Sequence, residues 1–369
     1  MPELFGKHYT RKDLARRVGR LDQVAGVRLV TLGDGMGRGV RLIEFRTGTG
    51  FSFDVVVDRA FDIGRCELGG RPLAWISNPG TVGPWYYEPE GLAWFRAWGG
   101  GMVVTCGLDH TLIGGEDSAA DFNQTHVVPT QSFGLHGRVG GLPARLIGYG
   151  ERWDGDECVL WAEGEVLQSA IFGEHLALRR RVEARVGESR FTIHDEVENV
   201  GHHRTSHMLL YHCNAGFPIV DAGAQLVVPA SATTTDYGVP IEGYRTLSDP
   251  IPNFTEACFE HELIAEPAGT VPIAVVNHQQ NLGVYQVFKL AQLPHHTVWR
   301  MMGEDTYAMA LEPSTNRDAG RWDAQKRGEL QYLETGETRQ YDLEIGALDG
   351  APAIAEFEAR VDRLHPVPA

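Results

Sequence analysis

Residues 207–218 read HMLLYHCNAGFP, an apolar run interrupted at two positions by the polar side chains of His212 and Asn214. Side chains of a β-strand alternate between its two faces, so an extended segment directs His212 and Asn214 to one face and His207 to the other. A histidine has a pKa near neutrality and can give or take a proton at working pH. The segment therefore predicts a strand that carries a candidate acid or base. The alternative is a core histidine whose ring nitrogens bond to the backbone or to Asn214.

Short segments rich in β-branched and aromatic residues recur on both sides of this run, separated by glycine-rich turns. They predict strands at 26–32, 40–45, 51–57, 158–166, 176–184, 190–197, 225–229, 282–288 and 340–346. One short helix is expected at 10–19, because Thr10 and Asp13 resemble a capping box and Gly19 a stop. No long helical period lies between the strands. The pattern predicts an all-β fold, a large antiparallel β-sandwich, in a single domain over residues 1–369.

Residues 33–39 read GDGMGRG, with a glycine spacing that resembles a dinucleotide-binding loop. A strand follows them, where a helix would be needed to hold a pyrophosphate. We interpret the segment as a turn.

The composition narrows the classes of partner. The formal charge of −16 comes from 49 acidic and 33 basic residues, which disfavours nucleic acid and anionic membranes and favours a neutral small molecule. The five cysteines are widely spaced without a C-x-x-C pair, so we expect reduced thiols, no zinc and no disulfide. The chain shows neither a signal peptide nor an apolar window of about 18 residues. A cytoplasmic protein is expected, and a homodimer is left open.

A charged cluster ends the apolar strand within residues 57–65, VDRAFDIGR. Asp58, Arg59 and Asp62 are expected to form one hydrogen-bonded corner. Such a corner is either a surface turn or a binding element, since an arginine at a strand end suits sugar hydroxyls or carboxylates. Arg59 is therefore a candidate substrate-binding residue.

Two further segments combine histidines with glycines. Residues 99–110, GGGMVVTCGLDH, end in Asp109 and His110, and glycines in a row let a ligand or a strand approach the backbone. Residues 133–138, FGLHGR, set His136 beside Arg138. Because this setting is typical of a loop, it favours ligand binding by His136 over a core role.

Residues 307–316, YAMALEPSTN, carry a carboxylate at the end of an apolar strand. Strand alternation sets Ala308, Ala310 and Glu312 on one face, and small residues beneath a carboxylate leave room for a ligand. Glu312 is either a half-desolvated base of raised pKa or the first polar residue of the exit loop.

Taken together, these side chains suit proton chemistry on a polyhydroxylated ligand. The acid–base candidates are Glu312 and His212; the binding candidates are His136, Arg59, Arg138, Asp109, His110, Asn214 and Arg300. Four tryptophans are available to stack on a sugar face, Trp75, Trp94, Trp98 and Trp299.

The segments LHGR, YHCNAGFP and LEPSTN, in this order in a chain of β-hairpins, resemble the galactose mutarotase-like superfamily of aldose 1-epimerases. An uncharacterised branch of that superfamily is similar in three segments, at residues 58–64, 105–109 and 311–316, the last of which is LEPSTN itself. The resemblance covers nearly the whole chain. It implies a β-sandwich of the supersandwich type, a carbohydrate ligand in a cleft on one concave sheet, and no cofactor.

The resemblance also implies roles for individual residues. Glu312 matches the glutamate that takes the proton of the anomeric hydroxyl, and His212 matches the histidine that protonates the ring oxygen. His136 matches a second, substrate-binding histidine, and Arg59 the substrate arginine. Mutarotases usually have a His-x-Tyr-Phe-Asn sequence, which departs from the spacing here, so His207 remains an alternative acid.

Three hypotheses follow. The leading one is anomer interconversion by Glu312 and His212. The second uses Asp109, His110, His136 and Glu312 as ligands of a divalent metal that polarises a keto sugar for isomerisation or elimination. The third is a sugar-binding module without catalysis, since a fold alone does not confer activity.

Overall fold

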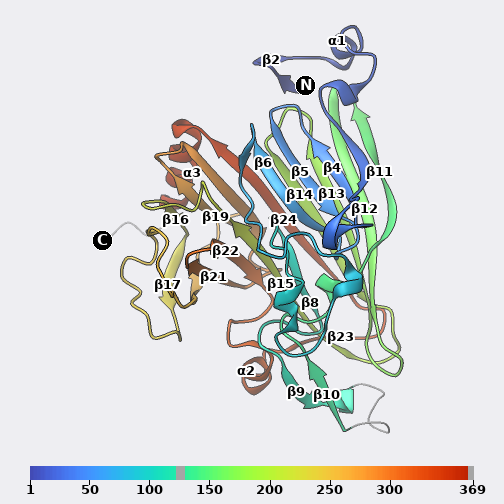
Figure 1. Ribbon diagram of the computed structural model, residues 1–369, viewed down its shortest axis with the longest axis vertical. Helices are drawn as coiled ribbons and strands as arrows, with labels where there is room; N and C mark the ends of the chain where they lie inside the picture. Colours follow the sequence, from blue (N-terminus) through green and yellow to red (C-terminus); the bar gives the residue numbers. More distant parts are fainter. Residues whose placement is uncertain (122–128, 365–369) are drawn as a thin grey trace.

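The computed structural model describes residues 1–121 and 129–364, and its regular structure is mainly antiparallel β-strands (Figure 1). An eight-stranded sheet has the order β11 (Arg145–Asp154), β12 (Glu157–Ser169), β13 (His175–Arg185), β14 (Arg190–Asn199), β24 (Thr338–Asp349), β20 (Leu282–Lys289), β19 (Thr270–Asn277) and β16 (Gln225–Val227). The expected all-β antiparallel sandwich is therefore confirmed.

A second sheet carries the candidate acid–base residues. Its order is β17 (Ala230–Thr234), β18 (Ala257–Leu263), β21 (His295–Met302), β22 (Tyr307–Ser314), β15 (Thr205–Ala215) and β23 (Gln331–Leu333), and β8 (Val104–Leu108) also pairs with β15. β15 and β22 are neighbours although about a hundred residues separate them. Figure 1 shows β15 and β8 near the middle of the molecule.

A five-stranded sheet and two small hairpins complete the strands. The sheet has the order β3 (Gly26–Thr31), β4 (Arg41–Arg46), β5 (Phe51–Val56), β6 (Asp62–Leu68) and β7 (Arg71–Pro72). The hairpins are β1 (Glu3–Leu4) with β2 (Lys7–His8), and β9 (Gly115–Ser118) with β10 (Thr130–Phe133).

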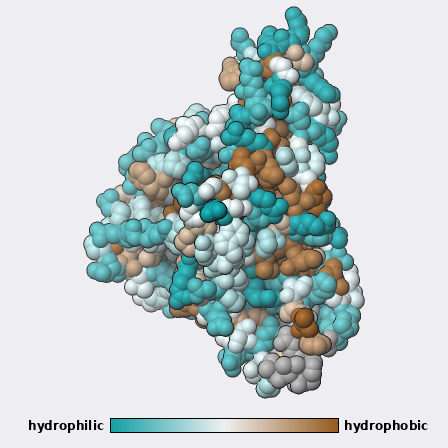
Figure 2. All heavy atoms as spheres, turned by 45° about the vertical axis from the view of Figure 1, so that its right-hand side comes forward, coloured by the Kyte–Doolittle hydropathy of each residue, from teal (hydrophilic) through white to brown (hydrophobic). Residues whose placement is uncertain are grey.

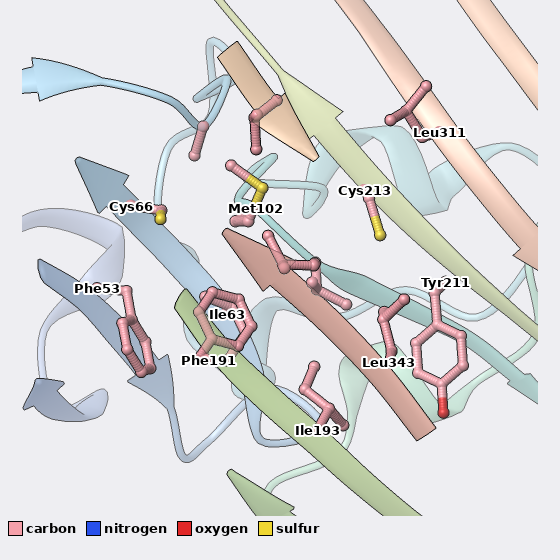
Figure 3. Packing of buried hydrophobic residues seen from close by; sticks show 14 of the residues in the cluster. Phe53, Ile63, Cys66, Met102, Phe191, Ile193, Tyr211, Cys213, Leu311 and Leu343 are labelled. Carbon is pink, nitrogen blue, oxygen red and sulfur yellow. The ribbon is translucent and has the colours of Figure 1, made fainter. Parts of the chain in front are cut away.

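The main core lies between the sheets. Tyr211 and Cys213 of β15 belong to it, together with Phe191 of β14, Leu343 of β24 and Phe53 of β5 (Figure 3). Leu210, one position away in β15, belongs instead to a separate cluster of tryptophans. The two faces of β15 therefore alternate as the sequence predicts.

The structure has three α-helices in its described residues, two more than expected. The predicted one, α1 (Arg11–Ala15), has the capping box between Thr10 and Asp13. α3 (Ala351–Asp362) was missed, although Ile354, Phe357 and Val361 recur at helical spacing and are its buried side chains. α2 (Gly320–Arg327) lacks such a period because it is mostly polar.

The described residues include six 3₁₀ turns, at Leu21–Gln23, Gly35–Gly37, Pro84–Tyr86, Ala93–Arg96, Ala119–Asp121 and Val139–Gly141. The second of them lies between β3 and β4, so the interpretation of the glycine-rich segment 33–39 as a turn is confirmed.

Hydrophobic residues gather in the middle of one face of the molecule, between hydrophilic areas (Figure 2). No helix within residues 1–121 and 129–364 is long and apolar enough to cross a membrane. All five cysteines are buried and free.

Candidate active site

His212 and Glu312 lie opposite each other on neighbouring strands. The register pairs Leu210 with Ser314 and Cys213 with Leu311, which sets the two residues across from each other and on one face. The distance between His212 Nε2 and Glu312 Oε1 is 3.2 Å, and their side chains are only 4% and 3% exposed. A histidine and a carboxylate, both buried and in contact, form a potential acid–base pair.

Burial favours the uncharged form of both groups. Desolvation lowers the pKa of His212 to about 4, against the smaller opposing effect of the Asn214 amide. Desolvation raises the pKa of Glu312, and the neighbouring carboxylates of Asp318 and Glu256 raise it further. Burial thus opposes the ionisation of both groups.

The contact between the two groups leaves capacity for a further partner. Glu312 Oε1 and His212 Nδ1 are buried and have no aligned hydrogen-bond partner among the described residues. Buried polar atoms are usually satisfied, so such atoms need an explanation. A ligand hydroxyl is one candidate partner for Glu312.

Tryptophans cover the pair on the same face of the sheet. The ring of His212 lies 5.0 Å from that of Trp98 and 5.6 Å from that of Trp299, both edge-to-face. Trp299 pairs with Ala310 on the adjacent strand, where a small residue leaves room for the indole. The space that Ala308 and Ala310 were expected to leave for a ligand is thus partly filled by this aromatic cluster.

A pocket of about 390 Å³ adjoins this aromatic cover. Its lining comprises Trp75, Ser77, Asn78, Pro79, Phe95, Trp98, Glu256, Trp299, Met301 and Thr306. Trp98 and Trp299 form its boundary with the pair, and Glu256 accepts a hydrogen bond of 2.8 Å from Trp299 Nε1. A concave, mostly apolar site with aromatic side chains and a few polar groups is typical of small-molecule binding.

Sequence reasoning missed Glu256, Ser77, Asn78 and Phe95 as lining residues of this pocket. Glu256 lies in a loop without a recognisable motif, so only the fold brings it to Trp299. The signal for Phe95 was present, because it lies between Trp94 and Trp98 in a dense aromatic stretch.

His136 lies beside the pair. Its ring is 5.8 Å from that of His212 and 4.7 Å from that of Trp94. His136 has a φ of 59°, in the left-handed region. Its backbone N–H donates a hydrogen bond to the backbone oxygen of Leu112. Burial lowers the pKa of the imidazole. The structure thus brings His136, His212 and Glu312 close to one another.

His207 does not reach this site. Its Nδ1 lies 2.9 Å from the backbone oxygen of Leu108, and its Nε2 lies 2.7 Å from the hydroxyl of Tyr341. Tyr341 belongs to the main core, on the other face of β15 from His212. The alternative in which His207 is the acid is therefore not compatible with this geometry.

The backbone N–H of Asp62 donates to the backbone oxygen of Arg59. The side chains of Asp58, Arg59 and Asp62 do not form the expected common corner, because each has other partners. Asp58 accepts hydrogen bonds from Arg41. Asp62 accepts them from Thr105 and Arg180.

Arg59 itself donates to three backbone oxygens, those of Gly140, Val82 and Ala97. It lines a second pocket, of about 240 Å³, on another side of Trp98. It does not line the pocket beside the pair.

Arg138 and Asp109 lie at a third pocket, of about 850 Å³, away from the pair. Arg138 forms an ion pair with Glu174. Asp109 is buried and accepts a hydrogen bond of 2.6 Å from Gln168. Neither this larger pocket nor the aromatic pocket is lined by His212 or Glu312. The aromatic pocket is lined by Trp98 and Trp299, whose rings lie 5.0 and 5.6 Å from that of His212, so we regard it as the better candidate.

The other predicted binding residues also point elsewhere. Arg300 lies on the face of β21 opposite Trp299 and donates to the backbone oxygens of Tyr244 and Thr246. Arg300, a predicted binding residue, does not line the aromatic pocket, because neighbouring residues of a strand face opposite ways.

Asn214 donates to the backbone oxygens of Gly101 and His212, so it supports the strand next to the pair. His110 Nε2 lies 3.1 Å from the backbone oxygen of Ile113, and its ring contacts Phe133. His110 thus contacts Ile113 and Phe133 and does not line the aromatic pocket.

The expected metal ligands do not converge. Within the described parts of the chain, no group of three or more His, Cys, Asp or Glu side chains is placed to hold a metal ion. Asp109, His110, His136 and Glu312 therefore do not form the site that the second hypothesis requires.

Comparisons with known proteins agree with the fold. The profile of the family described as Domain of unknown function (DUF4432) matches residues 37–347. No curated protein matches the chain.

Three solved structures are similar over most of their length. A candidate aldose 1-epimerase from Klebsiella pneumoniae has a TM-score of 0.81 at 22% identity, over 94% of this chain and 91% of its own. A galactose mutarotase-like protein from Clostridium acetobutylicum has a TM-score of 0.60 at 10% identity, over 89% and 99%. A galactose 1-epimerase from Lactobacillus acidophilus has a TM-score of 0.55 at 12% identity, over 88% and 99%. The fold is that of the galactose mutarotase-like proteins.

Proposed function

The chain belongs to the family described as Domain of unknown function (DUF4432), so we propose a function from the geometry of the candidate active site. We propose that the protein is a carbohydrate isomerase of the aldose 1-epimerase type. The observation that carries this proposal is the buried contact of 3.2 Å between His212 and Glu312 beside an aromatic pocket. The structural similarity to a protein named galactose 1-epimerase supports it at the level of the fold.

Anomer interconversion needs one proton donor and one proton acceptor. The acceptor takes the proton of the C1 hydroxyl while the donor protonates the ring oxygen, and the bond between C1 and the ring oxygen breaks. The open chain then carries an aldehyde at C1. Rotation about the C1–C2 bond and the reverse transfers close the ring as the other anomer, and both groups regain their initial state.

We assign Glu312 as acceptor and His212 as donor, which requires the charged form of the pair. The neutral form that burial favours contains the same number of protons, because it differs only in the transfer of one proton from His212 to Glu312. Their contact provides a direct path for that transfer. The pair therefore holds the proton that the reaction uses in both forms.

The surrounding side chains have roles in binding. Trp98 and Trp299 offer apolar faces to the C–H groups of a sugar ring, and Glu256 offers an acceptor to its hydroxyls. His136 lies close enough to His212 to contact the same ligand. No cofactor takes part in this scheme.

The test is the rate at which freshly dissolved pure anomers of several aldoses equilibrate, followed by polarimetry or NMR. Glu312→Gln should lower the catalysed rate by on the order of 10²- to 10⁴-fold, because it removes a proton-transfer group. Glu304→Gln is a matched control, since Glu304 is exposed in the turn between β21 and β22 and lies outside the pocket lining.

Two results would contradict the proposal. If the wild-type protein binds aldoses but accelerates none of them, the chain is a sugar-binding module. If Glu312→Gln keeps the full rate, the pair does not carry the reaction.

A further inference from the structure

Arg59 connects segments that are far apart in the sequence. It lies in the turn between β5 and β6. Its Nη1 donates to the backbone oxygens of Val82 and Ala97 at 2.9 and 2.8 Å, and its Nε donates to that of Gly140 at 2.6 Å. One guanidinium thus fixes the loop between β7 and β8 at two points and a 3₁₀ turn at a third.

The first two bonds hold the backbone that carries Trp98. Ala97 directly precedes this tryptophan, and Ser77 Oγ donates to the backbone oxygen of Trp98 at 2.5 Å. The peptide on each side of Trp98 is therefore anchored. Since the Trp98 ring is the nearest aromatic cover of His212, at 5.0 Å, its position decides how well water is excluded from the pair.

The third bond holds the segment that carries His136. Gly140 belongs to the 3₁₀ turn Val139–Gly141, which follows His136 by three residues. Tyr87, from the same loop as Trp98, donates its hydroxyl to the backbone oxygen of Gly137 at 3.0 Å. The loop and the turn are thus tied to each other as well as to Arg59.

We propose that Arg59 is a positioning residue of the candidate active site: it holds the Trp98 cover and the His136 turn in register with His212 without touching the substrate. This inference rests on the proposed function for its kinetic consequences. It replaces the expectation that Arg59 binds the substrate, because its Nε and Nη1 donate to backbone oxygens and the residue does not line the aromatic pocket.

Movement of Trp98 away from His212 would change the pKa of the His212 imidazole. The groups that face His212 are Glu312 from β22, Asn214 from its own strand, the His136 ring, and the indoles of Trp94, Trp98 and Trp299. Burial among them is the largest cause of the low pKa of His212. If Trp98 moves away, water reaches the imidazole and its pKa rises toward the ordinary value.

The experiment compares Arg59→Lys with Arg41→Lys. A lysine at position 59 keeps the positive charge, but its single ammonium group cannot reach the three separate oxygens that the guanidinium contacts. Arg41 is a matched control, because it bonds to Asp58 and to the backbone oxygen of Ala144 at the same corner, away from Trp98 and His136.

For Arg59→Lys we expect kcat to fall on the order of tenfold or more, because small misplacements of catalytic groups are costly. We also expect the acid limb of the pH–rate profile to move up by about one pH unit. Arg41→Lys should leave the profile where it is. Ser77→Ala, which removes one anchor of Trp98, should move the limb in the same direction by a smaller amount.

A second readout does not depend on turnover. NMR titration of the His212 imidazole should give a higher pKa in Arg59→Lys than in the wild type and in Arg41→Lys. If the wild type lacks epimerase activity but this shift is seen, the proposed function fails and the positioning role stands.

The inference is overturned if Arg59→Lys raises KM alone with an unchanged pH profile, which would indicate direct substrate binding. It is also overturned if Arg41→Lys shifts the His212 pKa equally, since the effect would then be one of general stability. An unshifted His212 titration in a folded Arg59→Lys protein overturns it as well.

Discussion

At the scale of single residues, burial controls the protonation of His212 and Glu312. An isolated histidine would be partly charged at neutral pH and an isolated glutamate fully charged. Here desolvation moves their pKa values in opposite directions and disfavours the charged form of both groups. The sequence indicated that the two were candidates, but their contact follows from the pairing of β15 with β22, which no local pattern specifies.

This protonation predicts a broad pH–rate profile. Activity requires the pair to hold one transferable proton. As the pH falls below about 4, His212 binds an extra proton; as it rises above the elevated pKa of Glu312, the pair loses its proton. We therefore expect kcat/KM to be flat around neutrality and to decline at both extremes. An acid limb near pH 6.5 would contradict the burial of His212.

The two histidines of β15 should respond differently to substitution. His212→Gln should lower the epimerase rate on the order of 10²- to 10⁴-fold, because it removes the proton donor. His207→Gln should keep the chemistry, because His207 contacts Leu108 and Tyr341 on the other face. Rates on pure anomers, with circular dichroism as the folding control, test this difference. Loss of turnover in His207→Gln with an intact fold would contradict it.

At the scale of elements, a buried ion network connects the sheets. Arg180 of β13 bonds to Asp195 of β14 and to Asp62 of β6, and its side chain is fully buried. Tyr211 of β15 donates its hydroxyl to Asp195 at 2.7 Å. The strand that carries His212 is thus linked to the eight-stranded and five-stranded sheets.

We predict that Arg180→Leu lowers the free energy of unfolding by about 3–5 kcal/mol, because it leaves two buried carboxylates unpaired. Urea unfolding measures the effect. The surface pair of Arg185 with Glu157 provides a control, and Arg185→Leu should change stability by less than about 1 kcal/mol. Equal losses in both variants would show that the burial of Arg180 is not decisive.

Element types were easier to predict than their partners. The strand at 207–215 follows from apolar residues and alternation, and its faces are as expected. The corner of Asp58 and Arg59 failed because short spacing in sequence does not fix side-chain direction in a turn. α3 was missed because it directly follows the long strand β24, separated from it by Gly350 alone.

At the scale of the whole molecule, the sandwich sets a large core on one face of β15 and the aromatic site on the other. The all-β class follows from the many short strands and turns, whereas the strand order needs the folded chain. The single domain over residues 1–369, the cytoplasmic location and the homodimer stay predictions.

Buried histidines and buried aspartates have opposite effects on the stability of the whole molecule as the pH falls. Burial lowers the pKa of His207 to about 4 and that of His261 to about 3. The unfolded chain then binds more protons than the folded one between pH 6.5 and about 4, so these histidines remove stability as the pH falls. Asp54 and Asp318, with pKa values raised to about 6, act in the other direction between about pH 6 and 4.

We predict that His207→Gln removes the part of the acid destabilisation that His207 causes. Relative to the wild type, the variant should lose less free energy of unfolding on acidification, by about 1.4 kcal/mol per pH unit between pH 6.5 and 4. Its stability at pH 7 should be lower, because the contacts with Leu108 and Tyr341 are lost. Urea unfolding of both proteins at several pH values measures the difference. Parallel stability curves would mean that His207 has the same pKa in the folded and unfolded states, and its burial would then not explain the acid response.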